Sequence, residues 1–132
     1  MPEMETIKKI LEHLGYESVL ELDINDSITL ESGSDAIMDL TIERVSDDHL
    51  SVAHYWVQRG DLMADPEIVF DISGDEWTPI EHKVDPRFHR HNEDGLPESQ
   101  QFATKTWDTN LQRQGFVDVA KQTDHQDTSS SK

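Results

Sequence analysis

The sequence predicts an α+β fold: an antiparallel β-meander of five to six strands with an N-terminal and a C-terminal helix packed on one face. Three observations support it. Apolar residues recur at helical spacing near both ends, they alternate with polar residues from 18 to 84, and short polar clusters separate the alternating runs. The length of 132 residues is enough for one domain. We place that domain at residues 1–117 and expect a disordered polar tail at 118–132.

The first helix is predicted over residues 4–14. Ile7, Ile10, Leu11 and Leu14 follow the i, i+3, i+4, i+7 pattern of one helix face. Gly15 can adopt the left-handed conformation that ends a helix.

The alternating region predicts the strands of the meander. Each strand is centred on apolar residues two positions apart, within 20–24, 28–30, 38–42, 50–56, 68–72 and 80–84. Pro79 has no amide hydrogen to donate, so we expect its strand to be at an edge or bulged. One face of the sheet should be apolar and the other acidic and solvated.

A long loop is predicted over residues 85–97, which contain two prolines and a glycine. Pro97 suits the first turn of a helix that runs to about Gln114. Its predicted inner stripe consists of Phe102, Ala103, Thr106, Trp107, Asn110 and Leu111. Gly115 should end this helix, with Phe116 folding back onto it.

The net charge of −17 is concentrated in residues 1–81, which hold 20 acidic and four basic residues. One interpretation is a carboxylate shell that keeps the protein hydrated in concentrated salt, because the composition resembles that of halophilic cytosolic proteins. The other is that the carboxylates imitate a phosphate array and occupy a nucleic-acid-binding protein. Direct binding to nucleic acid or to an anionic membrane is disfavoured by the charge. We therefore expect a protein partner. The longest apolar runs are only a few residues, and since we find no signal peptide or membrane span we expect a cytoplasmic location.

The most distinctive segment runs from His54 to Phe70. Asp61, Asp65 and Glu67 fall within seven residues of a predicted loop, where they could bind a divalent cation with His54 adding a nitrogen ligand. In the alternative interpretation, Asp61 follows Gly60 as part of a turn, and Asp65 binds local amides.

A second candidate metal site combines His82, Asp85, His89 and His91, since imidazole and carboxylate ligands suit zinc. Neighbouring arginines oppose a cation there, which favours a solvated loop.

A third candidate pairs Asp71 with Glu81 and Lys83 on adjacent strands. In metal-dependent nucleases, two acids hold the cation and a lysine orients water. A phosphate substrate would, however, be repelled by the acidic surface.

Three segments carry a family resemblance. They are Gly-Asp-Leu-Met-x-Asp-Pro-Glu at 60–67 with the preceding His54 strand, Trp-Thr-Pro at 77–79, and Trp-x-x-Asn-Leu-x-x-Gln-Gly-Phe at 107–116. Together they resemble an uncharacterised family of small α+β proteins from phage, plasmid and other mobile-element genomes. The resemblance implies a shared α+β domain without a settled activity, and it makes Trp107 and Asn110 motif residues. The sequence departs from the family pattern after Asp85.

These observations favour a small acidic, non-enzymatic interaction protein, encoded by a mobile element or by a salt-adapted host, without a cofactor. Two alternatives remain open. One is an acidic nucleic-acid mimic that inhibits a host nuclease or defence effector. The other is a metal-dependent hydrolase or nuclease that uses Asp61, Asp65 and Glu67.

Overall fold

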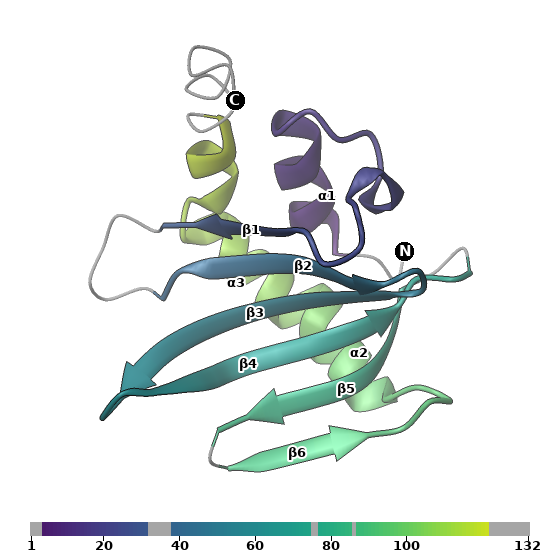
Figure 1. Cartoon of the computed structure of the whole chain (residues 1–132), viewed down its shortest axis with the longest axis vertical. Coiled ribbons are helices and arrows are strands. Elements are labelled where there is room, and N and C mark those ends of the chain that lie inside the picture. Colours follow the sequence, from purple (N-terminus) through teal and green to yellow (C-terminus); the bar gives the residue numbers. More distant parts are fainter. Residues whose placement is uncertain (1–3, 32–37, 75–76, 86, 122–132) are drawn as a thin grey trace.

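Six strands form one antiparallel sheet in the order β1-β2-β3-β4-β5-β6 in the computed structural model, which describes residues 4–31, 38–74, 77–85 and 87–121 (Figure 1). The helices lie on one side of this sheet. The predicted α+β class is therefore confirmed. The strands are β1 (Ser27–Leu30), β2 (Leu40–Ser46), β3 (His49–Gln58), β4 (Asp61–Asp71), β5 (Thr78–Val84) and β6 (Phe88–His91).

Helix α1 spans Glu5–His13 and confirms the predicted N-terminal helix. Ile7, Ile10 and Leu11 are buried in the core, as their spacing predicts. Gly15 has a φ of +97°, and the amide of Tyr16 donates to the carbonyl of Leu11 at 2.9 Å. This is the glycine-ended helix terminus expected from the sequence.

The strand predicted over residues 20–24 is wrong, because a short 3₁₀ helix, η1 (Val19–Glu21), occupies the segment. The Ser18 hydroxyl accepts a hydrogen bond from the amide of Leu20 at 3.1 Å and starts this turn. Val19 and Leu22, three residues apart, are buried, whereas Leu20 is exposed. The three-residue spacing of a 3₁₀ turn therefore replaces the two-residue spacing of a strand.

Strands β3 and β4 form a tight hairpin. The prediction that Asp61, Asp65 and Glu67 lie in a loop is therefore wrong. Arg59 and Gly60 both have positive φ, of 53° and 88°, which is the geometry of a two-residue type I′ turn. All three carboxylates consequently lie in β4. A bulge interrupts the pairing, since Ala53 pairs with Glu67 while Tyr55 pairs with Ala64.

Strand β5 lies between β4 and β6, so Pro79 is not in an edge strand. The other option predicted for Pro79 is correct, because the register shifts where it pairs with Phe70. The edge strand next to β5 is β6, and it lies inside the segment 85–97 that the sequence predicts to be a loop. Phe88 pairs with Val84, and the amide of Arg87 donates to the carbonyl of Val84 at 2.6 Å, so a short turn returns the chain to the sheet.

The C-terminal helix is continuous from residue 97 to 113 but is underwound in its middle. It consists of α2 (Pro97–Gln101), a π-helical segment η2 (Phe102–Trp107) and α3 (Asp108–Arg113). Its buried residues fall every four positions, at Ser99, Ala103, Trp107 and Leu111. An α-helix of 3.6 residues per turn would rotate such a row away from the sheet, whereas the wider π turn keeps it aligned.

This underwinding explains the partial error in the predicted inner stripe. Ala103, Trp107 and Leu111 are buried as expected, but Thr106 and Asn110 are exposed.

A further helical segment, residues 116–121, follows Gly115, which has a φ of +87°. Phe116 and Ala120 are fully buried in the core. Residues 118–121, which the sequence assigns to the tail, are helical in the structure. The rest of the predicted tail, 122–132, lies outside the described residues. Across the described ranges, the structure contains no helix with the length and apolar character needed to cross a membrane.

Helix α1 receives its N-terminal cap from the C-terminal helix. The residue before the helix, Met4, makes no side-chain cap bond. Instead, the amide of Thr6 donates to the Asp108 carboxylate at 2.7 Å, and the Thr6 hydroxyl donates to the Asp108 carbonyl at 3.0 Å. A free amide at the start of α1 is thereby satisfied by a residue 102 positions away in the chain.

Replacing Asp108 with Ala should lower the free energy of unfolding by about 1 kcal/mol, because the amide of Thr6 loses its acceptor. Asp108→Asn keeps an acceptor oxygen and should cost less. Urea denaturation of both variants measures the difference, with the exposed Gln112→Ala on the same helix as control. An Asp108→Ala protein as stable as the control would contradict this role.

Candidate functional site

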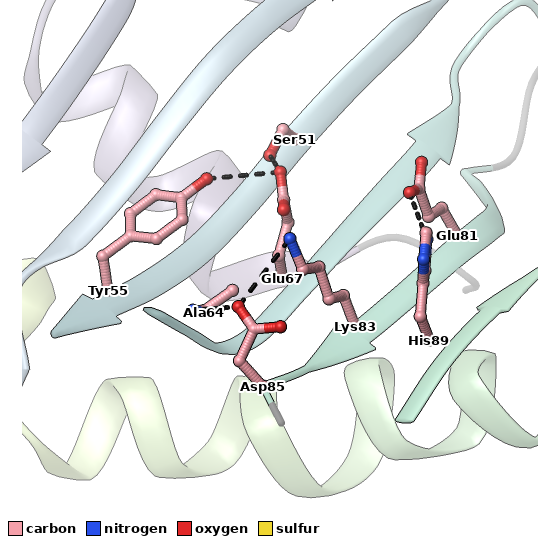
Figure 2. Close-up of polar contacts among 8 residues, drawn as sticks. All are labelled: Ser51, Tyr55, Ala64, Glu67, Glu81, Lys83, Asp85 and His89. Carbon is pink, nitrogen blue, oxygen red and sulfur yellow. Dashed lines mark hydrogen bonds and ion pairs between the residues drawn. The ribbon is translucent and has the colours of Figure 1, made fainter. Parts of the chain in front are cut away.

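The sheet face opposite the helices is the candidate site, and we call it the open face. Its members alternate along the strands with the core residues Ile42, Val52 and Ile68, and they are aligned by the strand register. In the described part of the chain, its members include Glu43, Ser51, Ala53, Tyr55, Glu67, Val69, Glu81, Lys83, Asp85, His89 and His91. Figure 2 shows the polar contacts among most of them.

Glu67 is the centre of a polar network on the open face. One of its carboxylate oxygens, Oε2, accepts hydrogen bonds from the Ser51 hydroxyl at 2.9 Å and from the Tyr55 hydroxyl at 3.2 Å (Figure 2). Both donors come from β3 and the acceptor from β4. Because two donors meet on one oxygen, the Glu67 carboxylate is held in a defined position.

The same contacts alter the acidity of Tyr55. Burial raises its pKa to about 12, and the negative charge of Glu67 together with its hydrogen bond adds to the effect. Tyr55 is consequently a neutral hydrogen-bond donor throughout the physiological pH range.

Asp85 fixes the geometry next to the bulge in β4. Its carboxylate accepts from the amide of Ala64 at 2.9 Å, and its own amide donates to the carbonyl of Ala64 at 2.8 Å. Lys83 lies 3.7 Å from the same carboxylate oxygen. Both bonds join Ala64 of β4 to the residue that follows β5, so Asp85 continues the contact between these two strands past the bulge.

Glu81 and His89 form a second contact on the open face, between the carboxylate of β5 and the Nε2 atom of β6. This pair is more exposed than the Glu67 network, with His89 54% and Glu81 34% accessible. Exposed pairs of this kind contribute little to stability. Their side chains are therefore available to a partner at little cost to the fold.

The predicted site residues are divided between the two faces of the sheet. His54 is on the helix side, where it is 5% exposed, and its Nδ1 donates to the backbone carbonyl of Asp39 at 3.1 Å. Its ring lies 5.7 Å from that of Trp107. Two of the predicted motif residues thus meet in the core, and burial lowers the pKa of His54.

Of the other predicted residues, Asp65 acts on His54 through its negative charge, which raises the histidine pKa against the effect of burial. Asp61 is exposed beside the Gly60 turn, Asp65 is in the bulge of β4, and Asn110 is exposed on α3. Glu67 lies in the open-face network. In the described part of the chain, no three histidine or carboxylate side chains lie close enough together to hold a metal ion. The metal hypothesis for Asp61, Asp65 and Glu67 therefore gains no support from the geometry.

The second candidate cluster is also split between the faces. His82 is buried on the helix side and bonds to Ser99, whereas His89 contacts Glu81 on the open face. In the third candidate, the Asp71 carboxylate accepts two hydrogen bonds from Ser73, at 2.6 and 2.9 Å, which lower its pKa. Asp71 and Glu81 therefore have separate partners rather than one shared site.

Sequence reasoning missed Ser51 and Tyr55 as partners of Glu67. The signal that could have found them is the Arg59-Gly60 turn, which pairs β3 with β4 from Gln58 and Asp61 onward. The bulge then shifts the register by one residue, and this shift has no plain signature in the sequence other than Pro66.

Glu67→Gln should lower the pKa of Tyr55, because the negative charge that opposes ionisation of the phenol is removed. The pKa should stay above its ordinary value, since burial is the larger cause. Tyrosinate absorbance across an alkaline titration measures the change, with Tyr55→Phe identifying the Tyr55 transition. An unchanged or higher pKa in Glu67→Gln would show that Glu67 does not act on Tyr55.

Comparison with protein-family models matches residues 5–117 to a domain of unknown function, DUF6908. No curated protein and no solved structure matches the chain. The matched range covers far more than half of the sequence and includes α1, all six strands and the helix from α2 to α3. The chain therefore belongs to the DUF6908 family, which has no assigned function.

Proposed function

We propose that this domain is a binding module and that its open face contacts a basic surface on a protein partner. The observation that carries the proposal is the arrangement of the layers: the helices cover one side of the sheet, and the other side presents a fixed polar network (Figures 1 and 2). Among the described residues, the open face carries five carboxylates, those of Glu43, Glu67, Asp71, Glu81 and Asp85, and one lysine, Lys83.

The shape of this face favours a macromolecule over a small ligand. Small molecules are usually held in concave, mostly apolar pockets, whereas the open face is a sheet surface of polar and charged side chains. Its central carboxylate is already oriented by Ser51 and Tyr55. Binding a partner there would require little further ordering, which lowers the entropic cost of association.

The charge of the face indicates the chemistry of the partner. A negative surface attracts a positive one, raises the rate of encounter and makes the complex sensitive to salt. A nucleic-acid mimic is the narrower form of this proposal, in which the partner's basic surface is a nucleic-acid-binding groove. The cytoplasmic setting and the mobile-element origin belong to the same proposal, and both come from the sequence alone.

A metal-dependent hydrolase is the competing function, and it uses the same residue, Glu67. It requires a cation to bind with Asp61, Asp65 and Glu67. Calorimetric titration with magnesium, manganese and zinc separates the two. The hydrolase must bind a metal ion and should therefore give a heat of binding, whereas the binding module has no such requirement.

Glu43→Gln combined with Glu81→Gln should weaken binding of the partner roughly tenfold, as expected for two exposed charge pairs. These carboxylates are suitable because neither bonds to the Glu67 network. A matched control, Glu12→Gln with Glu98→Gln, removes the same charge from the helices. Partners are recovered from host lysate with each protein, and the dissociation constant of the purified partner is then measured at two salt concentrations.

The proposal predicts that wild type and control bind alike, that the open-face variant binds more weakly, and that added salt weakens the wild-type complex. Equal affinity of all three proteins for every recovered partner would refute it.

A further inference from the structure

A buried serine–histidine pair lies on the helix side of the sheet, away from the open face. The Ser99 hydroxyl of α2 and the Nδ1 atom of His82 in β5 are 2.7 Å apart. Their side chains belong to residues that are only 2% and 7% exposed. A hydroxyl within hydrogen-bond distance of an imidazole nitrogen is the arrangement in which histidine activates a serine nucleophile.

Two aromatic rings fix the orientation of His82. The ring of Phe102 stacks against it at 5.5 Å with an interplanar angle of 21°, and the ring of Phe88 meets it edge-on at 5.0 Å. Phe102 is the first residue of the π-helical segment η2. Single π-helical turns occur frequently at functional sites, and here the segment begins at the residue that stacks on His82.

Ser99, although only 2% exposed, is one of the residues that line a hollow of about 400 Å³, together with Arg90, Leu96, Pro97 and Glu98. Leu96 and Pro97 give this hollow an apolar wall, and Arg90 lies at its charged side, 3.3 Å from the Glu98 carboxylate. A small, largely apolar molecule fits such a wall with its polar group directed toward the serine.

His82 is in the protonation state that a general base requires. Burial lowers its pKa, and the positive charge of Arg90 lowers it further. The imidazole is consequently neutral at pH 7 and can accept a proton from Ser99.

We propose that Ser99 is a nucleophile, with His82 as its general base, and that it takes the acyl group of a short apolar carboxylic ester bound in the hollow. The Ser99 Oγ attacks the ester carbonyl carbon while its proton passes to His82 Nδ1. The bond between that carbon and the alcohol oxygen then breaks, and the alcohol leaves with the proton from His82. Water attacks the acyl-serine in the second half, His82 accepts its proton, and the carboxylic acid is released as Ser99 regains its hydrogen.

This activity goes beyond the proposed binding function and does not depend on it. His82 and its open-face neighbours Glu81 and Lys83 point to opposite sides of β5, because successive strand residues alternate. A substitution that removes one function should leave the residues on the other side of the sheet unchanged.

The test is covalent labelling of the full chain with a fluorophosphonate probe, followed by mass spectrometry of the labelled peptide. We expect an adduct on Ser99 that forms at least tenfold faster in the folded protein than in urea, consistent with the contribution of a positioned base. Ser99→Ala should remove the adduct, and His82→Asn should slow its formation at least tenfold. The matched control is Ser46→Ala, since the Ser46 hydroxyl makes the same 2.7 Å contact with the Nδ1 atom of His49 between β2 and β3, and it should label as wild type does.

Hydrolysis of p-nitrophenyl acetate by the same proteins provides a second measurement, and it should be lost in Ser99→Ala and retained in Ser46→Ala. The labelling of wild type itself decides the question even if a variant fails to fold. No adduct on Ser99 of the folded wild type, or equal rates in the folded and unfolded chain, would overturn the proposal and leave the pair with a structural role alone.

Discussion

Burial of one apolar sheet face beneath the C-terminal helix is the constraint on which the rest of this structure depends. Ile42, Val52 and Ile68 form a continuous apolar row across β2, β3 and β4. A row of this kind must be removed from water, and the helix from 97 to 113 with the segment 116–121 covers it together with α1. The π-helical turn keeps Ala103, Trp107 and Leu111 over the sheet, and Asp108 attaches α1 to the same layer through Thr6.

The two sides of the sheet consequently have different chemistry. On the helix side, His54 and His82 are buried among aromatic rings and are kept neutral by desolvation. On the open face, Glu67 is charged and accepts hydrogen bonds from two hydroxyl groups. Alternation along each strand places residues that are adjacent in sequence on opposite faces. The residues of one sequence motif, such as His54 and Glu67, therefore lie on different faces of the sheet.

Sequence reasoning was most successful where one local pattern decides the structure. The period of α1, the positive φ at Gly15 and Gly115, and the alternation in β2, β3 and β5 could be predicted, because each depends on neighbouring residues.

It failed where a distant residue, a change of register or a competing local hydrogen bond decides. The bulge in β4 disguised the first half of that strand as a loop, and a serine cap turned a predicted strand into η1. The same bulge hid Ser51 and Tyr55 as the partners of Glu67. The Ser99–His82 pair joins residues 17 positions apart in different elements, which no spacing rule predicts.

The proposed function requires that the open face is the surface that meets the partner. Carboxyl footprinting tests it most directly, because a carbodiimide with an amine labels each accessible Asp and Glu in the free protein and in the purified complex. We expect labelling of Glu43 and Glu81 to fall at least fivefold in the complex, while Glu12 on α1 and Glu98 on α2 label as in the free protein. Protection of Glu12 and Glu98 with unchanged labelling of Glu43 and Glu81 would contradict the claim, because the partner would then be bound to the helices.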